Sequence, residues 1–200
     1  MIDRPEKPRN HPPINFATVE DGIYRSGFPE PANFPFLQTL NLKSVIFLCK
    51  ESYPKENLEI LNSHNINLFQ FGIDGHEKAH IPKRIISEAL KVLIDDRNHP
   101  VLIHCKCGKH RTLCLVGCLR KLQNWSLPSV LEEYKLSAGE KSREIDFKFL
   151  EMYDVTFVRQ YLHSIIYQYH GYGSKKRRLM YQKMFNINQK SVLFRPNHRS

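Results

Sequence analysis

A short apolar segment, a basic loop and an amphipathic segment, in that order, constrain this chain more than any other feature. Val101–His104 has the length and the continuous apolar character of a buried strand, and a helical pattern begins at Arg111. Between them, residues 105–110 contain a glycine and three basic side chains, which is typical of a loop. A strand, a loop and a helix start place successive backbone N–H groups around one point, where they bind an oxyanion.

The loop begins with a cysteine whose surroundings favour a nucleophile. The thiol of Cys105, at a helix N-terminus beside Lys106, Lys109 and Arg111, is expected to lose its proton near neutral pH, because positive potential stabilises the thiolate. Arg111 carries a planar fork that suits two phosphate oxygens at once. Thr112 can donate its hydroxyl to the sulfur, which would make the thiolate a better leaving group. The loop is therefore predicted to hold a nucleophile and an anion clamp together.

The order Cys105, five residues, Arg111 and Thr112 resembles the signature of cysteine-dependent phosphatases. Gly108 at the fourth position of the loop and the apolar strand before it strengthen this interpretation. The alternative is a buried structural cysteine that precedes a helix. That alternative leaves the cations of the loop without a role.

Composition limits the class of protein. The 200 residues, 41% of them hydrophobic, are enough for one domain with a real core. No apolar run is long enough to span a bilayer, and residues 1–13 lack the apolar core of a signal peptide and are expected to be a disordered arm. The five cysteines are interpreted as thiols in a reducing compartment, the cytoplasm or alternatively the nucleus. Cys105 and Cys107 lack a second ligand pair at zinc spacing, so no metal or other cofactor is expected.

The net charge of +10 is concentrated at one end. Residues 14–174 carry 19 Lys/Arg and 18 Asp/Glu, whereas residues 175–200 carry eight Lys/Arg and no acid. We therefore expect a catalytic domain over 14–173 and a basic C-terminal extension over 174–200. The extension is interpreted as solvated, with a nuclear-import patch or contact with acidic lipid or nucleic acid as the alternatives. Nucleic acid is not the expected partner of the domain itself.

Strands and helices are expected to alternate, which predicts an α/β fold with a central, mostly parallel sheet flanked by helices. The expected strands are 22–27, 44–49, 66–73 and 101–104. The expected helices are 33–40, 54–65, 81–96, 111–124, 143–153 and 155–169. A further helix is expected to restart after a break at 126–129 and to end at 136. Ligands bind beyond the carboxyl ends of the strands in such sheets, which is where the loop after residue 104 lies.

Phosphate transfer through a cysteine also needs an acid for the departing oxygen and a base for water. Asp74, after the strand expected at 66–73, is the first candidate, with His76, Glu77 and His80 on the same loop as alternatives. An ordinary turn aspartate is the competing interpretation, since Asp-Gly is common in turns. His104 is expected to order the loop rather than to transfer protons.

The cations around the cysteine are interpreted as contacts for a substrate with several phosphates. The alternative is that they form a solvated face of the loop. The residues expected to contact the substrate are Lys106, Cys107, Gly108, Lys109, His110, His76 and Lys78. Cys114 and Cys118, on the helix after the loop, are expected to be small core residues.

Residues 15–173 resemble the plant and fungal atypical dual-specificity phosphatases. The resemblance rests on residues 22–29, 69–73, 98–106, 108–112 and 114–121, and residues 164–173 resemble the plant branch in particular. It implies the compact cysteine-phosphatase fold, no metal, a phosphocysteine on Cys105 and Arg111 as the phosphate clamp. It also implies an inositol pyrophosphate as substrate, cleaved at its diphosphate group, with phosphoinositides or phosphoproteins as other substrates. The spacing of about thirty residues between Asp74 and Cys105 is also that of dual-specificity phosphatases.

Four features depart from the family. Cys107 stands where the family has arginine, Leu113 where it has glycine and Lys50 where it has proline, and the loop after Asp74 is shorter. We expect catalysis to survive with a weaker turnover of highly charged substrates. An inactive module that binds inositol polyphosphates is the alternative, and a sulfur-transfer or arsenate-reducing protein is the third class.

Overall fold

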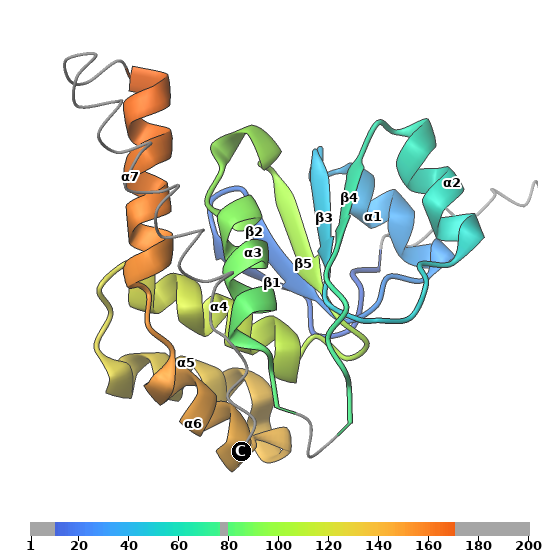
Figure 1. Ribbon diagram of the computed structural model, residues 1–200. Helices are drawn as coiled ribbons and strands as arrows, with labels where there is room; N and C mark the ends of the chain where they lie inside the picture. Colours follow the sequence, from blue (N-terminus) through green and yellow to red (C-terminus); the bar gives the residue numbers. More distant parts are fainter. Residues whose placement is uncertain (1–10, 77–79, 171–200) are drawn as a thin grey trace, which may run out of the picture. The chain divides into compact units, whose positions relative to one another are not determined.

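The computed structural model describes residues 11–76 and 80–170. Contacts divide the chain into two compact units, residues 1–153 and 154–200, which are described separately. The first unit holds the sheet and helices α1–α6 (Figure 1). The predicted basic extension and most of the predicted arm lie outside the described residues, and the limits expected for the domain, 14–173, stay a prediction.

A five-stranded sheet forms the centre of the first unit. Its spatial order is β1 (Ala17–Glu20), β2 (Ile23–Ser26), β5 (Val101–His104), β3 (Ser44–Phe47) and β4 (Asn67–Gln70). Only β1 and β2 pair antiparallel, so the predicted α/β fold with a mostly parallel sheet is confirmed. No strand was expected at β1, because its four residues form no apolar run; the structure shows that none of them is buried.

Helices follow the predicted pattern, with ends that differ by a few residues. They are α1 (Phe34–Gln38), α2 (Lys55–Ser63), α3 (Lys83–Leu93), α4 (His110–Leu122), α5 (Leu127–Ala138) and α6 (Glu144–Met152). Helix α4 contacts α3, α5 and α6, and Figure 1 shows α1 and α2 on the other side of the sheet from them. The apolar side of α3 buries Ile86, Ala89, Leu90 and Leu93, while Ile85 is half-buried. Burial of that face fixes α3 against the core.

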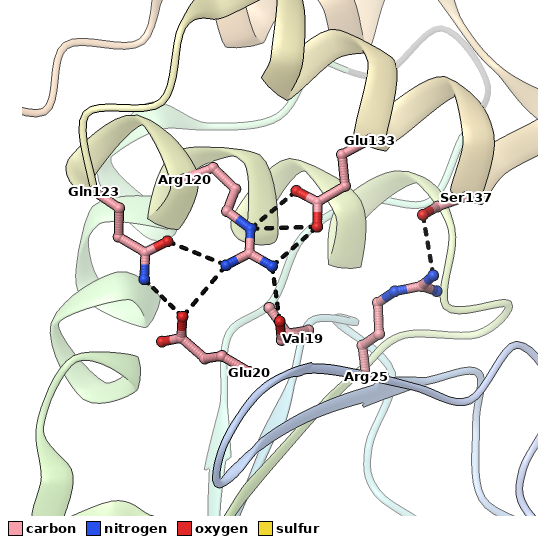
Figure 2. Close-up of polar contacts among 7 residues, drawn as sticks. All are labelled: Val19, Glu20, Arg25, Arg120, Gln123, Glu133 and Ser137. Carbon is pink, nitrogen blue, oxygen red and sulfur yellow. Dashed lines mark hydrogen bonds and ion pairs between the residues drawn. The ribbon is translucent and has the colours of Figure 1, made fainter.

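Helix α4 is enclosed on every side, because its residues from Arg111 to Arg120 are all buried. Figure 2 shows how its far end is held. The guanidinium of Arg120 donates to both carboxylate oxygens of Glu133 on α5, to Glu20 and to the carbonyl of Val19 on β1. A planar guanidinium can serve several acceptors at once, so this one side chain joins α4 to α5 and to the sheet edge. The loop of residues 105–109, which is predicted to bind phosphate and is called the phosphate loop below, lies at the opposite end of α4 and is thereby attached to a rigid element.

The second unit contains α7 (Thr156–His170). Asp154 caps its first turn, since one carboxylate oxygen accepts from the backbone N–H and the hydroxyl of Thr156. None of the helices in the described ranges is long and apolar enough to cross a membrane.

Candidate active site

The predicted strand, loop and helix are present around Cys105. β5 lies at the centre of the sheet between β2 and β3, and its last residue, His104, is in register with Ser26 and Phe47. Residues 105–109 form the loop, and α4 begins at His110, one residue earlier than predicted. The cysteine therefore lies at the carboxyl edge of the parallel strands, where α/β sheets bind their ligands.

Neighbouring segments hold the carbonyl groups of this loop. The backbone N–H of Phe28 donates to the carbonyl of Lys106 at 3.0 Å, and Nδ2 of Asn15 donates to that of Cys107 at 2.8 Å. An anion needs N–H groups turned toward it, so carbonyls must be satisfied elsewhere. The segments around residues 15 and 28 do this for two of them.

Gly108 allows the loop to lie against β2. Its φ is +69°, and a Cβ there would lie 2.3 Å from the carbonyl carbon of Ser26 and 2.5 Å from the nitrogen of Gly27. Any side chain would push two backbone segments apart. The glycine at the fourth loop position is thus required by a close approach as well as by its left-handed backbone.

Two carbonyl groups, one after β3 and one after β4, bind the side chain of Arg111. It is 8% exposed, and its Nη1 donates to the carbonyl of Ile73 at 3.0 Å and that of Leu48 at 3.5 Å. A Cβ on Gly75 would lie 3.1–3.3 Å from the guanidinium, so this glycine lets the chain pass close to it. Nε and Nη2 have no protein acceptor among the described residues. That edge is the one that the predicted fork geometry would offer to two phosphate oxygens, and its role as a clamp stays a prediction.

Asp74 lies beside this clamp. β4 ends at Gln70, earlier than predicted, and the chain then passes through Ile73, whose carbonyl accepts from Arg111, and through Gly75, where a Cβ would lie 3.1 Å from the same guanidinium. One carboxylate oxygen accepts from the N–H of His76 at 3.0 Å, and the other lies 3.0 Å from Nζ of Lys50. The His76 hydrogen bond and then Lys50 lower the pKa of Asp74. The carboxyl group is therefore ionised at neutral pH.

The contacts of Asp74 are compatible both with a turn aspartate and with a general acid or base. The bond from the N–H two residues later is that of an ordinary turn aspartate, the competing interpretation. Its position beside Arg111 also suits a role in the reaction, which stays a prediction.

The residues that were predicted to contact the substrate differ in exposure and in their protein partners. Lys106, Cys107 and His76 are exposed, and the ammonium of Lys109 donates to the carbonyl of Ala138 at the end of α5. The Nδ1 atom of His110 lies 3.2 Å from Asp146. Lys78 and the alternative acid Glu77 lie outside the described residues. Contacts of these residues with a substrate stay predictions.

Thr112 and Leu113, which follow Arg111 in the first turn of α4, are both buried. Thr112 was expected to donate to the sulfur of Cys105, but its hydroxyl is fully buried and has no hydrogen-bond partner among the described residues. The expected bond to Cys105 is therefore absent from this structure. Leu113 is 2% exposed, and its N–H still donates to the carbonyl of Lys109 at 2.8 Å. The leucine is therefore accommodated at the start of the helix.

Three of the buried cysteines have raised pKa values. All five cysteines are free, and only Cys107 is exposed. Burial raises the pKa of Cys49 to about 11, although Arg111 acts against it, and burial also raises the pKa of Cys114 and Cys118. Cys49, Cys114 and Cys118 stay protonated at neutral pH, and the last two are core residues, as predicted.

His104 is a structural residue, as expected. It is fully buried among the rings of Phe28, Phe47 and Tyr53, and its Nε2 lies 3.2 Å from the hydroxyl of Tyr53. Burial lowers the pKa of His104 to about 3, so the ring is neutral. It supports the end of β5 from beneath the loop.

Comparison with known proteins decides the family. Residues 11–171 match the sequence profile of the tyrosine phosphatase family. The chain belongs to this family. It is 62% identical to inositol diphosphatase DSP3 of Arabidopsis thaliana over 174 residues, which cover 86% of each protein. Within the tyrosine phosphatase family it therefore falls among the plant Siw14-like atypical dual-specificity phosphatases, as its motifs indicated.

Solved structures agree with this placement. The core catalytic domain of the PP-IP phosphatase SIW14 from Saccharomyces cerevisiae, in complex with citrate, has a TM-score of 0.74 and 45% identity, covering 76% of this chain and 93% of that one. TpbA of P. aeruginosa has a TM-score of 0.58 at 24% identity, covering 75% of this chain and 91% of that one, and shares the fold. The resemblance to a cysteine-phosphatase fold is confirmed.

Proposed function

We propose that this tyrosine phosphatase family member hydrolyses the diphosphate group of an inositol pyrophosphate through a phosphocysteine on Cys105. The observation that carries the proposal is the 62% identity to an inositol diphosphatase over 86% of both chains. The loop between β5 and α4 supports it, because Cys105 and Arg111 stand on either side of a turn built for an oxyanion.

The reaction has two steps at one phosphorus atom. The Cys105 thiolate attacks the terminal phosphorus, the bond to the bridging oxygen breaks, and that oxygen departs with the electron pair on the remaining inositol phosphate. Water then attacks the phosphocysteine, the S–P bond breaks and the thiolate is regenerated. Arg111 and the loop N–H groups hold the non-bridging oxygens through both steps, because negative charge stays on them.

The ionised state of Asp74 fits this substrate. A departing phosphate has a pKa near 6–7, so it leaves as an anion without needing a proton, in contrast to the alkoxide that departs from a simple alkyl phosphate. In the second step a carboxylate is the form that can accept a proton from water. A low pKa at Asp74 is thus compatible with a diphosphate substrate and unfavourable for an alkyl monoester.

Phosphate release from three substrates tests the proposal. We expect faster release from a diphosphoinositol polyphosphate than from inositol hexakisphosphate, which has a similar charge but no diphosphate, and slower turnover of an aryl phosphate. Equal rates with both inositol compounds would discard the diphosphate assignment. Tight binding without release from any substrate would instead favour the binding-module alternative, while family membership argues against sulfur transfer and arsenate reduction.

Asp74→Asn tests the leaving-group argument. We expect phosphate release from the diphosphate substrate to fall by about 10-fold, because the base of the second step is lost, and release from an alkyl phosphate monoester to fall by about 100-fold, because the small protonated fraction of Asp74 that serves as its donor is lost as well. Steady-state rates at neutral pH measure both. Asp21→Asn, the same change at an exposed aspartate in the turn between β1 and β2, is the control. Equal losses on both substrates would contradict this account of Asp74.

Further substrates and a cellular location are also part of the proposal. Phosphoinositides and phosphoproteins are proposed as additional substrates, for which the loop supplies the same chemistry. The cytoplasm is the proposed location, with the nucleus as the alternative if residues 175–200 act as an import signal.

A further inference from the structure

The first residue of α4 is bound to two helices that follow it in the chain. Nδ1 of His110 lies 3.2 Å from Oδ2 of Asp146 on α6 and 3.2 Å from the hydroxyl of Tyr134 on α5. Because His110 immediately precedes Arg111, these contacts connect the phosphate loop to two side chains with no part in the predicted site. We call His110, Tyr134, Asp146 and Arg143 the His110 network.

Asp146 is an ionised carboxylate in the interior. It is 1% exposed, its Oδ2 accepts from Tyr134 at 2.5 Å and from Nε of Arg143 at 2.9 Å, and its Oδ1 accepts from Nη2 of Arg143 at 2.9 Å. Burial acts to raise the pKa of Asp146, but hydrogen bonds from His110, Arg143 and Tyr134 outweigh it and lower the pKa. An ion pair buried in this way contributes little net stability, so it calls for another role.

The hydrogens of the His110 network can be assigned from these partners. Burial and the neighbouring carboxylate raise the pKa of Tyr134, so its hydroxyl keeps its proton and donates it to Asp146. Oδ2 of Asp146 is therefore an acceptor only, and Nδ1 of His110 must carry a hydrogen to face it. In the neutral imidazole, the lone pair is then on Nε2.

We propose that Asp146 is a positioning residue that acts through His110. It fixes the imidazole next to the phosphate loop in the Nδ1–H form and leaves Nε2 to meet a phosphate of the substrate. Nε2 can then accept a hydrogen bond from the hydroxyl of a hydrogen phosphate. This inference rests on the proposed function, because it assigns a residue to recognition of the same polyphosphate.

A double-mutant cycle separates positioning from a purely structural effect. We expect His110→Gln and Asp146→Asn each to raise the KM for a diphosphoinositol polyphosphate about 10-fold with a smaller change in kcat, because each removes the same contact. The double variant is expected to show the same 10-fold increase, because Asp146 has nothing left to position. A product of the two single effects, near 100-fold, would overturn the proposal.

Nuclear magnetic resonance supplies a readout that does not depend on activity. In the wild-type chain, the ¹⁵N shifts of His110 are expected to report a hydrogen on Nδ1, and Asp146→Asn is expected to mix the two tautomers. A hydrogen on Nε2 in the neutral wild-type ring would overturn the assignment. The same spectra apply if the chain releases no phosphate, so failure of the proposed function and failure of this inference are distinguishable.

Tyr134→Phe guards against a variant that does not fold. It removes one hydroxyl from the His110 network and preserves the ring that packs on Phe147. We expect a folded protein, by circular dichroism, with a two- to threefold weaker affinity for inositol hexakisphosphate. An unchanged affinity in Tyr134→Phe together with an unchanged affinity in Asp146→Asn would count against the proposal.

Discussion

Serine in place of Cys105 is expected to lower phosphate release by at least about 10⁴-fold, because a hydroxyl at neutral pH supplies almost no anion to attack phosphorus. The side chain is 2% exposed at the end of β5, so the smaller oxygen atom should fit without moving the loop. Affinity for inositol hexakisphosphate is expected to stay within about 2-fold, since Arg111 and the loop N–H groups are retained.

Two measurements check this result. Phosphate release gives the loss of turnover, and mass spectrometry of acid-quenched wild-type enzyme should find one phosphoryl group on the peptide that contains Cys105. Cys118→Ser is the matched control, because it makes the same atomic change in the buried middle of α4. That variant is expected to be less stable but active, whereas comparable activity in Cys105→Ser would reject the phosphocysteine mechanism.

Alanine at position 108 is expected to destabilise the chain by about 4 kcal/mol and to reduce turnover at least 100-fold, through about 1 Å of displacement in the loop. Two effects contribute. The backbone has a φ of +69°, and the added Cβ would lie 2.3–2.5 Å from backbone atoms of Ser26 and Gly27. Neither backbone segment can rotate away as a flexible side chain would, so β2 and the loop must separate.

Gly139→Ala isolates the conformational part of this effect. Gly139 also has a positive φ, +59°, but a Cβ there would meet nothing within 4 Å. We expect a cost of about 2 kcal/mol with little change in turnover. Urea unfolding measures the stabilities, and phosphate release measures the activities. Equal losses of activity in the two variants would show that the contact with β2 is not what shapes the loop.

Much of the site was predictable because its signals are local. The apolar run of β5, the glycine and cations of the loop and the helical periodicity of α4 occur within about twenty consecutive residues. Residues that close together in the sequence specify their own geometry, so Cys105 and Arg111 were placed correctly relative to the sheet. The mostly parallel fold followed for the same reason, from alternating elements with short connections.

Tertiary structure decided the features that join distant segments. β1 forms by pairing with β2, and its own sequence carries no apolar pattern that would predict it. The carbonyls of Leu48 and Ile73 that hold Arg111 come from two other strand ends, and backbone groups carry no sequence signal. Lys50 reaches Asp74 across 24 positions and, after the N–H of His76, helps to lower the pKa of its carboxyl group.

Asp146 is the clearest example of a contact that the sequence could not predict. It lies 36 positions after His110, in a helix whose sequence predicted only packing, yet it is the partner of the imidazole beside the phosphate clamp. The sequence by itself determined the fold class and predicted Cys105 as the nucleophile and Arg111 as the clamp, since each rests on a local pattern. Only the tertiary structure decided which distant groups contact Arg111, Asp74 and His110, because those contacts depend on how separate helices and strands pack together.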